Sequence, residues 1–440
     1  MGPHDGKPEG FRKVLFSRRP RMDYARIAHK LREQIIKFSG VLSSGLPKTA
    51  RRFVAEMVFG IQARQSVRLT EIARALEERI ALRKTEYRLC RQLGREELWG
   101  HLTEGVCRLA APQIKDNTLL VLDISDISKK YAKRMEYLGM VRDGSEKQLA
   151  SGYWTCQVVG TEREGTTILP VLNKLYSDVS PEWRGENQVM LEVIDIVSRH
   201  TGKRGIWVLD RGGDRGEILR PVLKRQLRFL IRLRGDRHLL YRGACLPVVD
   251  LASSCPMPYR ERVVREEGSK EKVYFLQFGF RKVRLPGRLE ELYLVVVKGF
   301  GEKPLMLLTN VKIRGSRKDL WRMVESYLMR WRIEETIRFI KQSYQLEDVR
   351  LLSYVRLQNM MALVMAVAYF TMAYLGLKTK LRVLMRYLLK AAKRVFGIPE
   401  FRFYALADGI KEHLFARKWG FQGLNLYPKP DYGQKWLFSP

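Results

Sequence analysis

The segment that organises this sequence is Tyr327-Leu-Met-Arg330-Trp-Arg-Ile-Glu334-Glu-Thr-Ile-Arg-Phe-Ile-Lys341. It contains no Gly or Pro, and its apolar residues recur every three or four positions, which predicts one amphipathic helix. At about 100° per residue, four polar side chains fall within roughly 60° of one another around that helix: Tyr327, Arg330, Glu334 and Lys341. One carboxylate therefore shares a stripe with an arginine, a lysine and a phenol. A solvated helix with ordinary i,i+4 ion pairs is the alternative interpretation.

Two aspartates upstream each end a short apolar run. The runs are Thr118-Leu-Leu-Val-Leu-Asp123 and Ile206-Trp-Val-Leu-Asp210, and both are typical of buried strands. Apolar spacing over residues 186–200 predicts a crossover helix before the second run, so the two strands are expected to be parallel. Asp123 and Asp210 then meet at one edge of the sheet. Either aspartate taken alone is also consistent with an ordinary turn.

The elements around these two runs predict an α/β fold. Short strands over residues 155–159 and 167–172 indicate an antiparallel meander with the first run. A helix over residues 214–226, which Asp214 is expected to cap, and a strand over residues 229–233 follow the second run. Three strands followed by alternating helices and strands is the order that an RNase H-like sheet requires.

The polar stripe and the two strand-end aspartates resemble the signature of the DDE transposases of the insertion sequence four family. That signature is Tyr, two residues, Arg, three residues, Glu, six residues and Lys, and it fits Tyr327, Arg330, Glu334 and Lys341. The resemblance implies an RNase H-like catalytic domain, a mixed sheet flanked by helices, with three acids as its catalytic and metal-binding residues: Asp123, Asp210 and Glu334. Asp126 is expected to lie past the strand, and Glu335 points about 100° away from Glu334, so neither is assigned to the site.

The resemblance also implies the chemistry and the partners. Carboxylate ligands suit Mg²⁺ or Mn²⁺, and two such ions are implied. Water would release a 3′-hydroxyl at the element end, and that hydroxyl would then attack target DNA at the same site. The residues expected to contact DNA are Tyr327, Arg330, Lys341, Arg211 and Trp331. An RNase H-like nuclease with the same acids, and an inactive transposase-derived DNA-binding regulator, are the alternative functions.

Residues 235–315 are expected to form a β-rich insertion in the catalytic domain, because their strand-like alternations are separated by Gly and Pro turns. Relatives in the family carry such an insertion, implicated in handling DNA ends, in which a Trp can stack a flipped base. This segment contains no Trp, which is a departure from the family pattern. Either the role is absent, or it is taken by one of the aromatic residues Tyr274, Phe275, Phe278 and Tyr293.

Composition points to a polyanionic partner. Lys and Arg number 81 against 47 Asp and Glu, giving a formal charge of +34, while 45% hydrophobic residues exclude general disorder. Double-stranded DNA is the favoured partner and an anionic membrane the competitor. The uncharged run from Met360 to Leu377 meets the lower limit for a bilayer span, but a buried helix is favoured, and no membrane partner is expected. Five scattered cysteines indicate neither a zinc site nor a disulfide framework.

The flanking regions are predicted to be helical and basic. Apolar spacing from Leu69 to Ile80 is compatible with a helix-turn-helix lying on a duplex and equally with a plain helical bundle. Its outer basic residues are Arg64, Arg68, Arg74, Arg79, Arg83 and Lys84. The start of the chain lacks the apolar core of a signal peptide and is interpreted as a basic arm that touches phosphates.

A chain of 440 residues is expected to hold more than one domain. The predicted organisation is a basic arm over residues 1–21, a helical DNA-binding domain over 22–112, the first part of the catalytic domain over 113–234, the insertion over 235–315, the second part of the catalytic domain over 316–377 and a basic helical region over 378–440. The predicted function is cut-and-paste DNA transposition. The protein is expected to act as a homodimer on terminal inverted repeats and target DNA, in a bacterial cytoplasm at the nucleoid.

Overall fold

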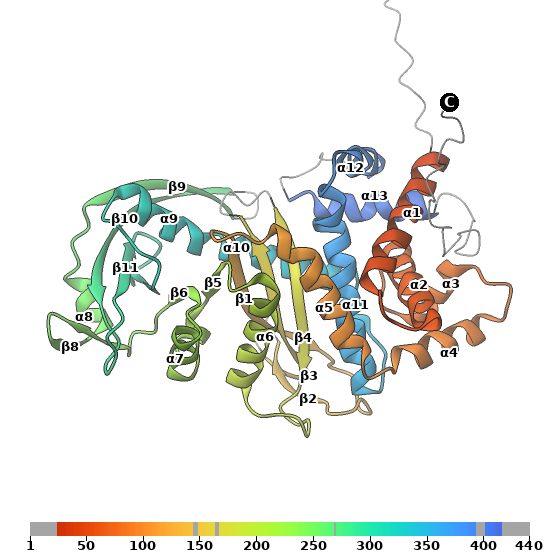
Figure 1. The fold of residues 1–440 in the computed structure, drawn as a ribbon, viewed down its shortest axis with the longest axis horizontal. Helices are drawn as coiled ribbons and strands as arrows, with labels where there is room; N and C mark the ends of the chain where they lie inside the picture. The colour runs from red at the N-terminus through yellow and green to blue at the C-terminus, as the bar shows by residue number, and fades with distance from the viewer. Residues whose placement is uncertain (1–23, 144–147, 163–166, 268–269, 393–400, 416–440) are drawn as a thin grey trace, which may run out of the picture.

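The computed structural model describes residues 24–143, 148–162, 167–267, 270–392 and 401–415. Within these residues a ten-stranded mixed sheet forms the centre, with a β-rich end on the left of Figure 1 and a helical end on the right. Its strands are β1 (Leu119–Ser128), β2 (Gly139–Arg142), β3 (Leu149–Thr161), β4 (Ile168–Tyr176), β5 (Ile206–Leu209), β6 (Arg228–Arg232), β9 (Tyr259–Glu267), β10 (Lys270–Val283), β11 (Leu292–Lys298) and β12 (Leu305–Thr309). The basic arm predicted over residues 1–21 lies outside the described residues.

The pairing of β1 with β5 sets the geometry of the central strands. β1 runs parallel to β5, with Val121 opposite Val208, and β5 runs parallel to β6. Helix α6 (Glu186–Thr201) precedes β5, and α7 (Gly216–Lys224) connects β5 to β6. The predicted crossover helix and the parallel strands are therefore confirmed. Both apolar runs are buried, as expected for strands covered on both faces.

The meander before α6 is also antiparallel, as predicted. β1 pairs with β3, and β3 pairs with β4 on its other side. The short strand β2 pairs with the first part of β3 and was not anticipated. Its four residues, Gly-Met-Val-Arg, are too few to give a clear alternation of apolar and polar side chains. The resulting strand order is β4-β3-β1-β5-β6.

The β-rich segment, residues 235–315, continues this sheet. β12 pairs antiparallel with β6, with Leu308 opposite Ile231, and β11, β10 and β9 follow in order. The segment also contains a small separate sheet of β7 (His238–Tyr241) and β8 (Ala244–Pro247), and a short helix, α8 (Val248–Ser253). The strands predicted for this segment are thus hydrogen-bonded, through β12 and β6, to the central strands of the same sheet.

Helices from both ends of the chain pack together beside β4 (Figure 1). They are α1 (Tyr24–Leu42), α2 (Lys48–Arg64), α3 (Leu69–Leu76), α4 (Leu82–Leu93), α5 (Leu98–Ala110), α11 (Tyr354–Met372), α12 (Thr379–Ala391) and α13 (Phe403–Phe415). Gln62 in α2 donates hydrogen bonds to the Val367 carbonyl oxygen and to Thr371 Oγ1 in α11, at 3.2 and 2.8 Å. Residues some 300 positions apart in sequence therefore share one core.

Helix α11 lies at the centre of that core. Among the described residues, the segment Tyr354–Gly376 is long and apolar enough to cross a membrane, but 89% of its most apolar window is buried inside the protein. It packs against β4, α2 and α5. The prediction of a buried helix is confirmed, and the small and Met-rich side chains of this segment are those that close packing on several sides favours.

The segment predicted as one continuous helix is divided in two. Helix α9 (Arg317–Leu328) ends before Met329, and α10 (Arg330–Ser343) begins after it. The prediction of one helix was therefore wrong at Met329. The two helices pack on different partners: α9 lies against β11, whereas α10 lies against α13 and the 3-10 turn Leu346–Asp348. Tertiary packing explains a break that the uniform helical periodicity did not indicate.

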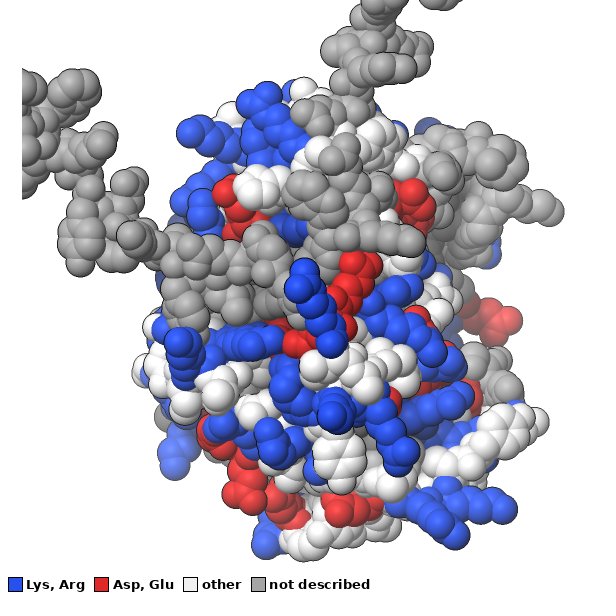
Figure 2. Space-filling view, turned by 90° about the vertical axis from the view of Figure 1, so that its right-hand side faces the viewer, with Lys and Arg blue, Asp and Glu red and all other residues white. Residues whose placement is uncertain are grey.

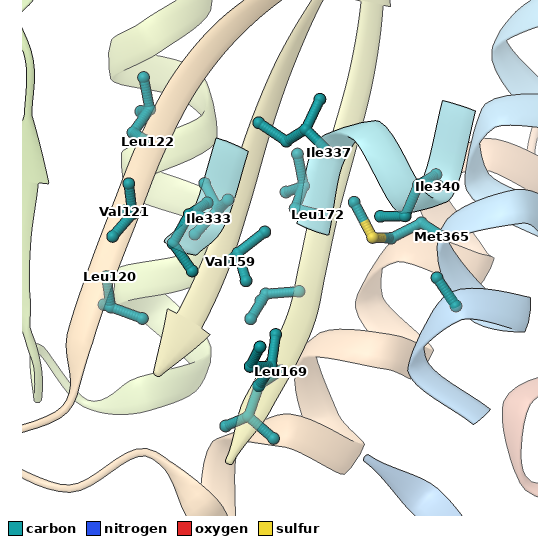
Figure 3. Packing of buried hydrophobic residues seen from close by; sticks show 14 of the residues in the cluster. Leu120, Val121, Leu122, Val159, Leu169, Leu172, Ile333, Ile337, Ile340 and Met365 are labelled. Atoms are coloured by element: carbon teal, nitrogen blue, oxygen red, sulfur yellow. The ribbon is translucent and has the colours of Figure 1, made fainter. Parts of the chain in front are cut away.

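Helix α10 crosses the sheet with its apolar stripe inward. Figure 3 shows Ile333, Ile337 and Ile340 beside apolar side chains of β1, β3 and β4. All three isoleucines are buried. Since neighbouring helical positions differ by about 100°, burial of Ile333 leaves Glu334 at the side of the helix, outside the core.

The central position of α11 in the helical core is tested by removing one of its buried aromatic rings. Phe370 is fully buried, and its ring lies 5.3 Å from that of Phe38 and 5.4 Å from that of Tyr374, measured between centroids. Phe370→Ala is expected to lower the free energy of unfolding by about 3–5 kcal/mol, measured by urea denaturation followed by circular dichroism. Phe275→Ala, at a side chain 73% exposed, is the control and should change it by less than about 0.5 kcal/mol. Equal losses in both variants would contradict the central position of α11.

Candidate active site

Asp123 and Asp210 occupy equivalent places on parallel strands. Val121 and Val208 are register partners, and each aspartate lies two residues further along its strand direction. The backbone of Asp210 is still extended, with φ −78° and ψ −164°. Because side chains alternate between the faces of a sheet, both carboxylates project from the same face near the same edge. The structure thus brings the two predicted acids together.

The turn after β5 fixes the Asp210 side chain. Its Oδ1 accepts a hydrogen bond from the backbone N–H of Gly212 at 2.7 Å and so caps the 3-10 turn Arg211–Gly213. A Cβ at position 212 would lie 2.9 Å from the same oxygen, closer than real side chains allow. Glycine is therefore required for this backbone to approach the carboxylate. The remaining oxygen of Asp210 is on an exposed residue.

Glu334 reaches the site from α10 and is paired with Arg330. Arg330 Nη1 lies 2.8 Å from Glu334 Oε1. The arginine is buried, whereas the Glu334 side chain is 45% exposed. Glu334 and Asp123 line the same cavity, with a volume of about 810 Å³. The carboxylate therefore faces open space while the guanidinium is held beneath it.

The three acids influence one another electrostatically. Burial raises the pKa of Asp123 to about 7, the positive charge of Arg330 opposes the rise, and the negative charges of Asp210 and Glu334 add to it. A carboxyl group titrates this high when it is desolvated among like charges. Raised pKa values of this kind are frequent at functional sites.

The donor set of this site suits a divalent cation. As the side chains stand, no three Asp, Glu, His or Cys residues within the described part of the chain are close enough to hold a metal ion. Glu334 is turned onto Arg330, whose charge offsets the repulsion among the acids. Carboxylate oxygens are the ligands that Mg²⁺ and Mn²⁺ prefer, so the residues that would hold such an ion are Asp123, Asp210 and Glu334.

Tyr327 lies in the core and not at the surface where a DNA contact was expected. Its side chain is 1% exposed, and the Arg330 guanidinium carbon lies 5.8 Å from the centre of its ring. Burial raises the pKa of Tyr327, and the nearby charges of Arg330 and Arg232 act against that rise. The Tyr327 ring therefore packs against the guanidinium of Arg330 at the junction between α9 and α10.

Lys341 lies in the same cavity but is engaged by acids. Its Nζ is 3.4 Å from Asp126 Oδ1 and 3.8 Å from Glu347 Oε1. The prediction that Asp126 lies past the strand was wrong, because β1 continues to Ser128. Asp126 is buried and lines the cavity, as do Asp143 and Asp348.

Glu335 points about 100° around the helix from Glu334, as helical geometry predicts. It pairs with Arg338 at 2.7 Å and does not line the cavity. Arg211 is exposed next to Asp210, at a position open to solvent. Trp331 belongs to α10, but its side chain lies outside the described part of the structure.

Two further expectations are changed by the structure. Asp214 does not cap α7, since its carboxylate accepts hydrogen bonds from the Arg234 backbone N–H at 2.6 Å and from Arg237 Nε at 2.7 Å. Among the aromatic residues of the β-rich segment, Phe278 and Tyr293 are buried, so neither can stack on a ligand. Tyr274 is half-buried, and Phe275 is exposed.

Part of the chain is similar to a known protein family. Residues 175–370 match the family described as "Transposase DDE domain". This segment includes Asp210 and Glu334 but begins after Asp123. The predicted similarity to DDE transposases is confirmed over these residues, and membership of the insertion sequence four family stays a prediction. A search of curated proteins gave no match.

A likeness was also found among solved structures. The cryo-EM structure of the piggyBac transposase synaptic complex with hairpin DNA covers 90% of this chain and 86% of its own, at 11% sequence identity and a TM-score of 0.42. At that score the likeness carries no further conclusion.

Metal titration tests the grouping of the three acids without reference to any reaction. Mn²⁺ binding, measured by isothermal titration calorimetry, is expected to weaken by at least about tenfold in Asp123→Asn, Asp210→Asn and Glu334→Gln, because each substitution removes an anionic oxygen ligand. Glu335→Gln is the matched control and should bind Mn²⁺ like the unchanged protein. If Glu335→Gln weakened Mn²⁺ binding and Glu334→Gln did not, the metal ligand on α10 would be Glu335 and the assignment of Glu334 would be wrong.

Proposed function

We propose that the protein is a DNA transposase that cleaves at the ends of a mobile element and joins the released 3′-hydroxyl to target DNA. The observation that carries the proposal is the meeting of Asp123 and Asp210 at one sheet edge with Glu334 on α10. The match of residues 175–370 to a transposase DDE domain supports it. We further propose an RNase H-like catalytic fold, on the strand order β4-β3-β1-β5-β6, and membership of the insertion sequence four family.

The proposed reaction is metal-assisted attack of a hydroxyl on a phosphodiester. Two divalent cations, when bound, would activate the attacking oxygen and stabilise the leaving oxygen. The carboxylates of Asp123, Asp210 and Glu334 serve as ligands and not as nucleophiles. Asp210 is held for this by its bond from Gly212, and Glu334 by the packing of α10 on the sheet.

In this proposal, two basic side chains of the cavity, Arg330 and Lys341, position the DNA. Arg330 lies beside Asp123 and Glu334, and its planar guanidinium suits a phosphate oxygen. Lys341 provides a point charge further along the same cavity. Both are charge-balanced by carboxylates in the structure, so binding of phosphate and of metal would exchange partners among groups already present.

Helix α4 is the proposed DNA-contacting element of the helical end. Figure 2 shows Lys and Arg side chains spread over this end of the molecule. The buried residues of α4 are Thr85, Leu89 and Leu93, which form a single narrow stripe. Arg83, Tyr87 and Arg91 each precede one of them by two positions, which places them about 160° around the helix. The outward face of α4 is therefore basic and aromatic, with Tyr87 75% exposed.

A charged network fixes the direction of α4. Glu56 of α2 is fully buried and bonds to Arg52 at 2.6 Å and to Arg88 at 2.5 Å. Glu78, in the turn between α3 and α4, bonds to Arg88 and to Thr85. Two helices joined by a short turn, the second exposing basic residues from its start, form the arrangement that a helix-turn-helix presents to the major groove. This arrangement of α3 and α4, with a basic outward face on α4, favours DNA binding over a plain helical bundle.

Loss of any of the three acids is expected to abolish cleavage while DNA binding survives. Asp123→Ala, Asp210→Ala and Glu334→Ala should slow Mg²⁺-dependent nicking at candidate element ends on the order of 10³-fold, since metal ligation supplies several kcal/mol to the barrier. Affinity for the same DNA, measured by fluorescence anisotropy, should stay within about twofold. If a variant cleaves at nearly the rate of the unchanged protein, the substituted residue does not belong to the site.

The cleavage products separate the proposal from its alternatives. A transposase releases 3′-hydroxyl ends at one defined boundary and joins them to a second DNA. Degradation without a boundary and without joined products would indicate a nuclease. Binding without cleavage by the unchanged protein would indicate a DNA-binding regulator.

The outward face of α4 gives a separate expectation for binding. Arg83→Ala and Arg91→Ala should each lower the slope of log affinity against log salt by about 0.9, the amount for one phosphate contact. Tyr87→Ala should weaken binding with little change of slope, because a stacking or apolar contact releases no counterion. Lys224→Ala, at an exposed lysine ending α7, is the control and should leave both quantities unchanged. Unchanged binding in all three α4 variants would return this region to a plain helical bundle.

A further inference from the structure

The cavity lined by Asp123 and Glu334, here called the acidic cavity, lies on the β1 side of Asp210, and a second cavity, here called the arginine cavity, lies on its β6 side. Its volume is about 730 Å³. Its walls come from α7, the turn after β6, the start of β7 and the turn after β10. The charged residues that line it, apart from His238, are Arg220, Arg234, Arg237, Arg288, Asp214 and Asp236. Four arginines against two aspartates leave a net positive lining.

One of these acids is fully used in building the wall. Asp214 is buried, and its carboxylate accepts hydrogen bonds from Arg237 Nε at 2.7 Å and from the Arg234 backbone N–H at 2.6 Å. Arg237 and Asp214 therefore neutralise each other and fix the turn after β6. Truncating one partner of such a pair would leave a buried charge unpaired, so this pair is structural.

The other arginines keep their charge for the cavity. Arg234 donates from Nε to the carbonyl oxygen of Arg211 at 3.2 Å, a bond that orients the guanidinium without neutralising it. Arg220 is exposed on α7. Arg288 pairs with Glu290 at 3.4 Å, an exposed contact that contributes little. The first residue of α7, Gly216, also lines the cavity and adds the partial positive charge of a helix start.

The arginine cavity is joined to the turn that presents Asp210. The chain passes from Asp210 through the 3-10 turn Arg211–Gly213 to Asp214, and Arg234 is bonded to the carbonyl of Arg211 in that turn. In the sheet, β1 carries Asp123, β5 ends at Asp210, and β6 leads to Arg234. The acidic cavity, Asp210 and the arginine cavity therefore follow one another along the sheet.

We propose that the arginine cavity binds the phosphodiester backbone of the DNA strand that flanks the reacting phosphate, on the β6 side of Asp210. The inference rests on the proposed function and adds the path of the strand to it. A guanidinium group can donate two parallel N–H bonds to the oxygens of one phosphate. A concave wall with a net positive charge also attracts a polyanion. The β-rich segment contributes His238 and Arg288 to this wall, so it takes part in holding the strand.

Neutral phosphates along the DNA test the proposal. A duplex end is prepared as a set, each member carrying one methylphosphonate linkage, and affinities are measured without divalent metal. The unchanged protein is expected to lose about tenfold in affinity at one or two positions. The double variant Arg220→Gln/Arg234→Gln should be insensitive at those positions and should lower the salt slope by about 1.8.

Two controls make the result specific. The first control is Arg199→Gln, at an exposed arginine near the end of α6. This helix leads into the start of β5, so Arg199 lies at the opposite edge of the sheet from Asp210. The variant should bind each DNA like the unchanged protein. The second control, Arg220→Lys/Arg234→Lys, should restore most of the slope of log affinity against log salt. Arg237 is left unchanged in all variants because it holds Asp214. Circular dichroism confirms that each variant is folded.

The outcomes are distinguishable from those of the proposed function. Equal sensitivity to neutral linkages in the double variant and the unchanged protein overturns the inference, whether or not the protein cleaves DNA. Adenosine monophosphate is tested by calorimetry as a free phosphate ligand. Binding of this nucleotide that is lost in the double variant, with DNA affinity unchanged, also overturns it and assigns the cavity to a small ligand.

Discussion

The parallel pairing of β1 with β5 is the constraint on which the site depends. Val121 opposite Val208 brings Asp123 and Asp210 level with each other, two residues further on. Because side chains alternate along a strand, a slip of one residue would turn either carboxylate to the other face. The buried apolar runs before both acids oppose such a slip, since it would also move their side chains between the two covered faces. Hydrophobic burial thus positions the polar groups of the site.

Charge balance is the second requirement that the site meets. Burial raises the pKa of Asp123 to about 7, and the negative charges of Asp210 and Glu334 add to the rise, because three neighbouring carboxylates repel one another. Arg330 offsets this repulsion from a buried position supported by Tyr327 and paired with Glu334. Lys341 does the same for Asp126. The protein as a whole is strongly basic, so the cluster of acids is a local exception whose counter-charges lie within a few ångströms.

Sequence reasoning succeeded where a local pattern determines the geometry. An apolar run ending in an acid located Asp123 and Asp210, and the 100° helical step separated Glu334 from Glu335. It failed where distant contacts decide. The periodicity is the same on both sides of Met329, and the break arises because α9 and α10 pack on different partners. Asp214 was assigned to a local cap, but its bonds go to Arg234 and Arg237 some twenty residues away. Nothing local marked the continuation of β1 to Asp126.

The pairing of β12 with β6 means that the β-rich segment is not a removable module. A truncated protein lacking residues 235–315 would present β6 as a bare edge, with unpaired N–H and C=O groups along buried, apolar residues. Exposed edges of this kind recruit strands from other molecules and lead to aggregation. Shortened forms of this chain would therefore have to supply a replacement strand or a cover for β6. For the same reason, length variation among natural relatives should concentrate in the turns of this segment and spare the strand that closes on β6.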